Sequence, residues 1–386
     1  MAAVAAVRAL LSLHQSVTLQ HSFGHIPAQS PSTFLLRVFC SAPIDGNELK
    51  PPVDTENVSL LENLNLLGVD VKMARLRQPG VLRKASTNEQ GLTRFLQGKG
   101  ASRKVIAGII SRYPRAITRS IDHLAQRWDL WRDIFQKDEE IVSILDRSPE
   151  SFFRTSDNGN LKKNIAFLTS LGLNAKDLHR LLTTAPRTFS NSLALNKQMV
   201  EFLEDIYAKL GGNNPEQFPR FVISRNLYIL IRSTKRVKTN IDMLRASLQL
   251  RDSELLALLE GSGAEILDLS NEYLKRNFKS LNQRMASLGC RKADLKKLIL
   301  SYPIVLYIGP DTLNTKLDCL LSGGITMKQI LEKPKVLDYS TQNITGRLGE
   351  LQRLGYDFQK SGINILDSSR KRFDAKMGKL NASPDD

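Results

Sequence analysis

The sequence predicts an all-α fold in which one helical unit repeats along the chain as an α-solenoid. Two observations support this prediction. A proline turn recurs at intervals of 31 to 41 residues, and almost no run of residues alternates with the period of two that a half-buried strand requires. Units of this length that each expose an apolar face bury it by stacking on their neighbours. We therefore expect a curved, right- or left-handed solenoid with a concave groove.

The recurring turn aligns in eight stretches, six of which begin with proline. Proline cannot continue the hydrogen bonds of a preceding helix and disfavours helical geometry in the residue before it, so each turn should end a helix. Apolar pairs such as Ile144-Leu145 should close that helix, and the last two residues of each stretch should anchor the turn in the core. Among the aromatic residues, Phe152, Phe153 and Phe189 are expected to be core residues. The eight stretches are Pro79–Leu82, Pro114–Ile117, Pro149–Phe152, Pro186–Phe189, Leu227–Leu230, Ala264–Leu267, Pro303–Leu306 and Pro334–Leu337.

Serine or threonine recurs six residues after the turn position. These side chains accept hydrogen bonds from the exposed N–H groups in the first turn of a helix, so we expect them to cap the helix that follows. Several of those helices end in Leu-Gly, as at Leu171-Gly172, where glycine suits the left-handed C-terminal cap. The six expected N-caps are Ser120, Thr155, Ser192, Ser233, Ser270 and Ser340.

The N-terminal 44 residues differ in composition from the rest of the chain. They contain two arginines and eight Ser or Thr among Ala, Leu and Val but no Asp or Glu, which is typical of a transit peptide. We predict a transit peptide in 1–44, a polar linker in 45–58, the solenoid in 59–380 and a disordered tail in 381–386. The solenoid should end in a basic capping helix over Ser369–Lys379. The sequence contains no run of about 18 apolar residues, so we predict no membrane span.

The net charge is +16 and the isoelectric point is near 9.8. Such a surplus indicates a polyanionic partner, with nucleic acid ahead of anionic lipid, and a generally basic surface is the alternative. The three cysteines are scattered without a CxxC pair, and the sequence has no P-loop and no Ser/His/Asp order. We therefore predict a protein that is not an enzyme and that holds no cofactor or metal.

Basic residues recur two residues before the turn position, one residue after it and five residues after it. Equivalent places in successive units lie on one edge of a solenoid, so these residues predict a stripe that binds phosphates, and arginine can also hold a guanine edge with two hydrogen bonds. The alternative is that individual arginines bind helix C-terminal carbonyls or pair with Asp146 and Glu150. The residues are Arg112, Arg147 and Arg225 in the first place, Arg115, Arg187 and Lys335 in the second, and Arg119, Arg154 and Arg232 in the third.

Two further features extend this prediction. Lys235 and Arg236 stand at the start of an expected helix, where the helix dipole already favours anions. Tyr228 and Tyr273 each belong to one of the two units that lack the turn proline. A tyrosine beside a basic groove can stack on an unpaired base, and core packing is the alternative for both.

The repeated turns, together with the blocks Ile110–Thr118, Arg147–Arg154, Ala185–Ser192 and Ala264–Asn271, resemble the mitochondrial transcription termination factor (mTERF) family over about residues 58–380. The resemblance implies a left-handed superhelix of about eight or nine mTERF repeats. As in the vertebrate member that ends transcription after the ribosomal RNA genes, it implies a monomer in the matrix nucleoid. That monomer would wrap duplex mitochondrial DNA in the leucine tRNA gene, bend and unwind it, evert bases and obstruct the mitochondrial RNA polymerase.

The same resemblance implies roles for single residues. Lys335 stands where the family is expected to have arginine, and lysine keeps the phosphate attraction but loses the paired guanine contact. Tyr228 stands where phenylalanine is expected, and stacking should survive that difference. The residues implied to support everted bases are Arg147, Tyr228 and Tyr273, and those implied to read or clamp DNA are Arg154, Arg187, Arg236 and Arg372.

Two other functions remain open at this point. Relatives in the family act on mitochondrial ribosomal RNA, and an α-solenoid with stacking aromatic residues suits single strands, so an RNA-binding or ribosome-assembly factor is one alternative. A protein-binding scaffold is the other, and the arginine stripe argues against it.

Overall fold

The computed structural model describes residues 56–154 and 157–382, and every regular element in these ranges is a helix, which confirms the all-α prediction. The predicted transit peptide, most of the predicted linker and the last four residues of the predicted tail lie outside the described residues. The chain forms a larger compact unit, Asp54–Asn314, and a smaller unit that contains Thr315–Asp386.

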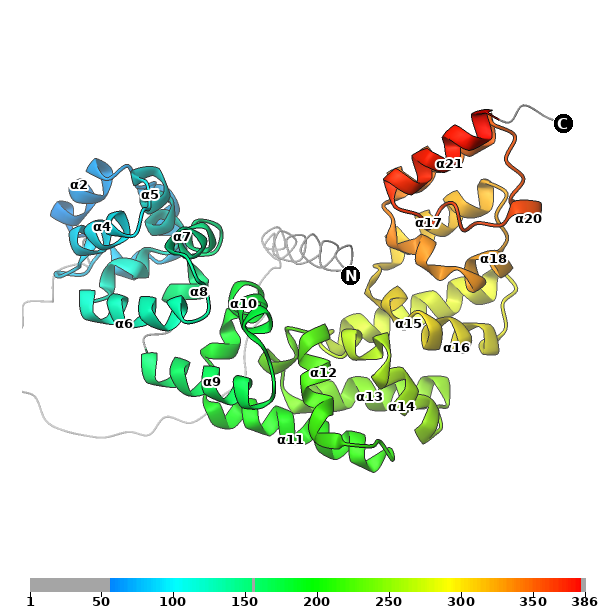
Figure 1. Ribbon diagram of the computed structural model, residues 1–386, viewed down its shortest axis with the longest axis horizontal. Coiled ribbons are helices and arrows are strands. Elements are labelled where there is room, and N and C mark those ends of the chain that lie inside the picture. Colours follow the sequence, from blue (N-terminus) through cyan, green and yellow to red (C-terminus); the bar gives the residue numbers. More distant parts are fainter. Residues whose placement is uncertain (1–55, 155–156, 383–386) are drawn as a thin grey trace, which may run out of the picture. The chain divides into compact units, whose positions relative to one another are not determined.

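The larger unit repeats one order of elements: a first helix, a second helix and a short turn (Figure 1). This order is the solenoid repeat that the turn pattern predicts. The elements are α2 (Val58–Leu66), α3 (Val71–Arg77) and η1 (Pro79–Val81); α4 (Glu89–Gly98), α5 (Arg103–Arg112) and η2 (Pro114–Thr118); α6 (Ile121–Arg132), α7 (Asp138–Arg147) and α8 (Glu150–Phe153); α9 (Asn158–Ser170), α10 (Ala175–Thr184) and η3 (Pro186–Phe189); α11 (Leu193–Lys209), η4 (Pro215–Gln217), α12 (Phe218–Arg225) and η5 (Ile229–Ile231); α13 (Thr234–Leu248), α14 (Asp252–Glu260) and η6 (Ser262–Ile266); and α15 (Asn271–Ser287), α16 (Lys292–Ser301) and η7 (Pro303–Tyr307).

The same order continues toward the C-terminus. The elements are α17 (Pro310–Ser322), α18 (Met327–Glu332) and η8 (Pro334–Asp338), then α19 (Thr341–Arg353), α20 (Phe358–Ser361) and the basic helix α21 (Arg370–Ala382). Nine first helices, from α2 to α19, thus lie among the described residues, in agreement with the predicted number of repeats. Helix α21 includes residues 381 and 382, so the first two residues of the predicted tail are helical.

The turns are anchored as the sequence predicts. The last two residues of all eight aligned stretches are at most 7% exposed. Phe152, Phe153 and Phe189 are buried, and the Phe152 ring meets the edges of Trp128 and Trp131 with centroids 5.9 and 5.1 Å away. Burial of each such ring stabilises the fold by about 1.5 to 3 kcal/mol, so the turns contribute directly to the core.

Five of the six predicted N-caps are confirmed, since each serine side chain accepts from the backbone N–H three residues later. The prediction for Thr155, which lies outside the described residues, is wrong. The Asp157 side chain caps α9 and accepts from the Asn160 N–H at 2.8 Å. Helix α9 begins two residues later than the spacing suggests, and aspartate caps as well as serine. The confirmed caps are Ser120, Ser192, Ser233, Ser270 and Ser340.

The predicted Leu-Gly helix ends are also confirmed. Gly172 has a φ of 82°, and the Leu173 N–H reaches back to the Leu168 carbonyl at 3.3 Å, which is the hydrogen bond of a left-handed C-terminal cap. Residues with a Cβ rarely adopt this φ, so glycine sets where α9 ends and directs the chain into α10.

Within the larger compact unit, neighbouring repeats stack through their first helices. Contacts join α4 to α6, α6 to α9, α9 to α11, α11 to α13 and α13 to α15. A solenoid has this arrangement, in which each repeat buries its apolar face against its neighbours alone.

A buried polar side chain, which we call the clasp residue, closes most units. It stands seven residues after the residue that precedes the first helix. In α13 the clasp residue is Asn240, whose Nδ2 donates to the carbonyls of Leu267 and Leu269 at 3.1 and 2.8 Å, in the turn region of the same unit. No sequence pattern predicted this role. The six clasp residues are Arg127, Asn164, Asn240, Asn277, Lys316 and Arg347, all at most 7% exposed.

Candidate nucleic-acid interface

The turns of neighbouring units contact one another. Element η1 contacts η2, α8 contacts η3, η3 contacts η5 and η6 contacts η7. We call the seven aligned turn stretches of the larger unit, from Pro79–Leu82 to Pro303–Leu306, the turn ribbon. Most of the predicted DNA-contacting residues flank it, so side chains far apart in the sequence are brought to adjacent turns.

The arginines two residues before the turn position are partly engaged by the protein. Arg112 donates to the Gly108 carbonyl at 3.0 Å and pairs with Asp146 at 3.2 Å. Arg147 is exposed and donates from Nε to the Ser143 carbonyl of its own helix at 3.3 Å. The Arg225 guanidinium lies 4.4 Å from the centroid of the Phe221 ring. The contacts of Arg112 and Arg147 agree with the alternative in which arginines bind helix carbonyls or pair with acidic residues. Arg147 nevertheless remains exposed to solvent.

The residues one place after the turn position are exposed at Arg115 and Arg187. Arg115 lines a hollow of about 580 Å³ between η1 and η2, together with Arg77 and Lys84 and with no carboxylate. Three cations around a concavity without an opposing acid attract a phosphate group. The lining of this hollow therefore favours an anion at the start of the turn ribbon.

The arginines five places after the turn position join one unit to the next. Arg119 donates to the Phe153 carbonyl at 2.9 Å, and burial lowers the pKa of its guanidinium below the usual range. Arg232 pairs with Asp268 at 3.6 Å and lies 5.8 Å from the centroid of the Tyr228 ring. Arg154 forms an ion pair with Glu150 and remains exposed.

The start of α13 has the charge that the sequence predicts. Lys235 is exposed, Arg236 is half-buried, and the first turn of the helix contains no acidic residue. Ser233 caps the Arg236 N–H at 3.2 Å. The positive end of the helix dipole and the two cations favour an anion at this place.

Tyr228 and Tyr273 are half-buried, which places them between a core residue and a free surface ring. The Tyr273 hydroxyl donates to the Tyr307 carbonyl at 2.7 Å, and the Arg276 guanidinium lies 5.0 Å from the centroid of its ring. Tyr228 carries Arg232 beside its ring. The Tyr273 hydroxyl is thus held by the protein, the Tyr228 ring lies beside Arg232, and both residues remain partly exposed.

Two predicted residues belong to the smaller unit. Lys335 is exposed in η8, and Arg372 is exposed in the basic helix α21. They extend the basic character of the chain within that unit.

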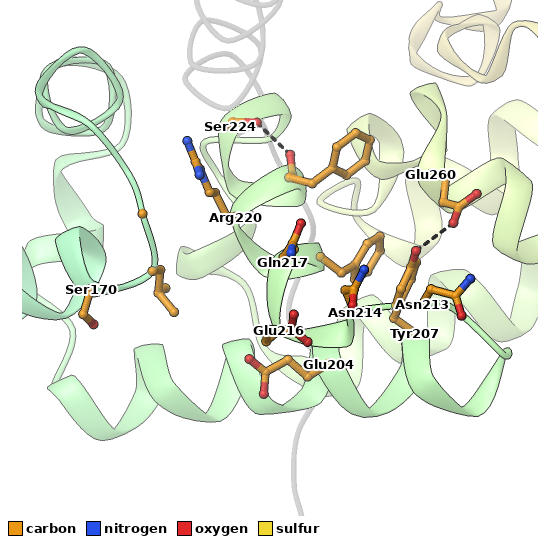
Figure 2. A pocket seen from close by; sticks show the side chains of 14 residues that line it. Ser170, Glu204, Tyr207, Asn213, Asn214, Glu216, Gln217, Arg220, Ser224 and Glu260 are labelled. Carbon is orange, nitrogen blue, oxygen red and sulfur yellow. Dashed lines mark hydrogen bonds between the residues drawn. The ribbon is translucent and has the colours of Figure 1, made fainter.

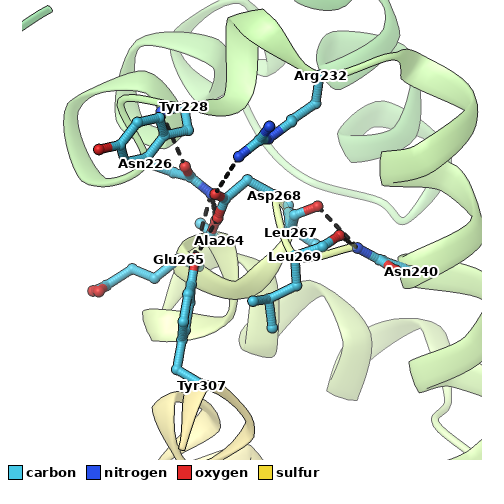
Figure 3. Close-up of polar contacts among 10 residues, drawn as sticks. All are labelled: Asn226, Tyr228, Arg232, Asn240, Ala264, Glu265, Leu267, Asp268, Leu269 and Tyr307. Atoms are coloured by element: carbon cyan, nitrogen blue, oxygen red, sulfur yellow. Dashed lines mark hydrogen bonds and ion pairs between the residues drawn. The ribbon is translucent and has the colours of Figure 1, made fainter. Parts of the chain in front are cut away.

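A buried polar network at η5 and η6 escaped the sequence analysis. Asp268, whose side chain is 7% exposed, accepts from the Asn226 amide at 3.0 Å and from the Tyr307 hydroxyl, and it pairs with Arg232 (Figure 3). Asn226 is fully buried and also donates to the Ala264 carbonyl at 3.0 Å. The only sequence signal was the absence of the turn proline in these two units.

A separate cavity of about 680 Å³ lies beside α11 and α12 (Figure 2). Its lining combines the rings of Tyr207 and Phe218 with the carboxylates of Glu204 and Glu260, and the Tyr207 hydroxyl donates to Glu260 at 2.7 Å. Burial, and then the negative charges of Glu201 and Glu216, raise the pKa of Glu204. None of the predicted DNA-contacting residues lines this cavity, and its acids repel phosphate.

Among the described residues, no group of three or more acidic, histidine or cysteine side chains has an arrangement that would hold a metal ion. Within the same ranges, no helix has both the length and the apolar character that crossing a membrane requires.

Comparison with known proteins places these features in context. Residues 61–374 match the model of the mTERF family. The chain is 52% identical over 358 residues to transcription termination factor 1, mitochondrial, of Rattus norvegicus, covering 92% of this chain and 95% of that protein. It is 53% identical over 325 residues to the Homo sapiens protein of that name, covering 84% and 82%. It is 31% identical over 329 residues to transcription termination factor 2, mitochondrial, of Homo sapiens, covering 85% and 84%.

Proposed function

This chain belongs to the mTERF family, and from that premise we propose that it binds double-stranded mitochondrial DNA in a sequence-specific manner and terminates transcription at the boundary between the ribosomal RNA and leucine tRNA genes. The observation that supports this proposal most directly is the turn ribbon, along which exposed cations recur from unit to unit. The names of the relatives agree with a role in mitochondrial transcription termination.

Affinity in this proposal comes from phosphate contacts. Arg115, Arg187 and Lys235 are exposed, and a cation that neutralises a phosphate releases condensed counterions, so binding should be strongly salt-dependent. Arg154, Arg236 and Arg372 give direction and sequence readout, because arginine can hold a guanine edge with two hydrogen bonds. Lys335 supplies phosphate attraction without that paired contact.

Base eversion is the step that fixes the protein at its site. The DNA is bent and unwound in a left-handed superhelical groove, and bases leave the stack at a cost of roughly a few kcal/mol each. Stacking on the rings of Tyr228 and Tyr273 offsets this cost, and Arg147 supports a third base. The bound monomer, in the matrix nucleoid, then obstructs the mitochondrial RNA polymerase.

A competition experiment tests the proposal. Residues 45–386 are titrated with labelled duplex that carries the leucine tRNA site, against scrambled duplex and against mitochondrial ribosomal RNA. We expect the site duplex to compete most strongly. A preference for ribosomal RNA would instead support the RNA-binding alternative and overturn the proposal.

The Tyr273→Ala variant tests the eversion step. It removes the ring, so site-specific binding and termination should fall by about tenfold or more, whereas binding to scrambled duplex should change little, because stacking is worth about 1 to 3 kcal/mol per base. Equal losses with both duplexes would show that Tyr273 acts only in the core.

A further inference from the structure

The contacts of Asp268 join the two tyrosines that the proposed function assigns to everted bases. Asp268 pairs with Arg232, which lies beside the Tyr228 ring, at an N–O distance of 3.6 Å. It also accepts from the Tyr307 hydroxyl, and the Tyr307 carbonyl accepts from the Tyr273 hydroxyl at 2.7 Å. One buried carboxylate thus stands between two ring positions that lie 45 residues apart in the sequence.

The same repeat positions are used differently at another joint of the turn ribbon. Where Tyr113 and Arg119 meet the next unit, the Tyr113 ring stacks on Phe153 at 6.3 Å and Arg119 donates to the Phe153 backbone carbonyl. Asp268 occupies the place of Phe153, and Asn226 occupies the place of Tyr113. A joint made of rings and backbone is therefore replaced here by a carboxylate with side-chain donors.

A buried carboxylate beside a DNA-binding surface requires an explanation, because its charge repels phosphate and its desolvation is unfavourable. The donors from Asn226, Tyr307 and Arg232 satisfy it (Figure 3). Arg232 in turn depends on it, since its Nε is buried without a hydrogen-bond partner. The ion pair holds the guanidinium in place and reduces its attraction for phosphate.

We propose that Asp268 is a positioning residue that sets both base-supporting tyrosines, Tyr228 through Arg232 and Tyr273 through Tyr307. This role rests on the proposed function, because it concerns site-specific binding and base eversion. The inference goes beyond that function in two ways. It separates Arg232 from the cations that bind phosphate, and it makes one residue position the rings of both Tyr228 and Tyr273.

The Asp268→Asn variant tests this role through two opposite effects. It keeps the shape of the side chain but releases Arg232 and removes one negative charge. We expect affinity for scrambled duplex to stay equal or to rise by up to about threefold, whereas the preference for the site duplex falls by about tenfold. The fluorescence increase of 2-aminopurine at an everted position should fall with it.

Two further variants distinguish a positioning role of Asp268 from a loss of folding. Tyr307→Phe removes only the hydroxyl donor and should lower the site preference in the same direction by a smaller factor. Combining Arg232→Gln with Asp268→Asn replaces the ion pair by two neutral amides, so the double variant should lose less than the product of the single losses.

Glu260→Gln is the matched control. It makes the same change in charge and also removes a carboxylate that accepts from a tyrosine hydroxyl, that of Tyr207. We expect its site preference to match that of the wild type. Site preference unchanged in Asp268→Asn, or parallel losses on both duplexes with a lowered melting temperature, would overturn the inference. A wild-type protein without site preference would overturn the proposed function itself.

Discussion

The basic residues of the turn ribbon fall into two groups at the level of single side chains. Arg187 and Lys235 are exposed to solvent, whereas Arg119 and Arg232 contact the Phe153 carbonyl and Asp268. An exposed cation attracts phosphate, and an arginine bonded to the protein fixes the position of its neighbours. At the place five residues after the turn position, Arg154 is exposed whereas Arg119 and Arg232 join neighbouring units, so one repeat position faces solvent in one unit and forms the joint in others.

The stability of the folded protein should depend on pH through His123. Burial, followed by the positive charges of Arg127 and Arg119, lowers the pKa of His123 from 6.5 to about 4. The folded protein thus keeps the ring neutral, while the unfolded chain takes up a proton near pH 6.5. The stabilisation is complete above pH 6.5 and is lost as the pH falls towards 4.

We expect the midpoint of urea unfolding to fall between pH 6.5 and 4 and to fall less steeply in His123→Gln, measured by circular dichroism. The remaining slope reports the other titratable groups, which both proteins share. Identical slopes for the two proteins would show that His123 takes up its proton equally in both states.

Single residues also show how far the sequence can predict a site. Phe152 was predicted to be a core residue, because the turn pattern alone places it beside apolar neighbours. Asp268 was not predicted, because its partners Asn226 and Tyr307 are 42 and 39 residues away. Such hydrogen bonds depend on the register of three stacked turns, and no local pattern specifies that register.

The N-caps show the same distinction for whole elements. A six-residue spacing located five of six helix starts, because the turn and the cap lie in one short segment. At α9 the spacing failed, since the chain takes two more residues to reach Asp157. Aspartate and threonine are both favourable N-caps, so local propensity alone does not choose between the two positions.

Substitution of the two residues tests the corrected cap. Asp157→Ala should lower the free energy of unfolding by about 1 kcal/mol, because the Asn160 N–H loses its acceptor. Thr155→Ala should leave it unchanged within about 0.5 kcal/mol. Chemical denaturation of both variants decides the matter, and a larger effect from Thr155→Ala would restore threonine as the cap.

The clasp residues make a stronger prediction. Asn240→Ala leaves the carbonyls of Leu267 and Leu269 without their buried donor, so the free energy of unfolding should fall by about 2 to 4 kcal/mol. Thr239→Ala, on the same helix, should stay within about 0.5 kcal/mol of the wild type. If the two variants unfold alike, the clasp contributes no net stability.

For the molecule as a whole, composition predicted a polyanionic partner and periodicity predicted a solenoid, because both properties are sums over many residues. Composition does not show which basic side chains are available to contact phosphate. Many of the 55 basic residues are paired or bonded to carbonyls, so the net charge overstates the number of phosphate contacts.

The salt dependence of DNA affinity measures how many phosphate contacts the protein makes. Lys235→Gln should reduce the slope of log affinity against log salt by about 0.9 on scrambled duplex, because one phosphate contact is lost. Arg119→Gln should leave the slope unchanged while lowering stability, since its guanidinium is bonded within the fold. Fluorescence anisotropy between about 50 and about 200 mM salt gives both values. Equal slopes for the two variants would contradict the division of the basic residues.

The clasp residues have a mechanical consequence. Each one ties a first helix to the turn region of its own unit, whereas neighbouring units of the larger compact unit are joined by helix packing and by contacts such as that of Arg119 with the Phe153 carbonyl. A unit can therefore move against its neighbour without breaking its own clasp. The joint at η5 and η6 is braced by the contacts of Asp268, so we expect the strain from the DNA bending that we propose to be taken up on either side of it.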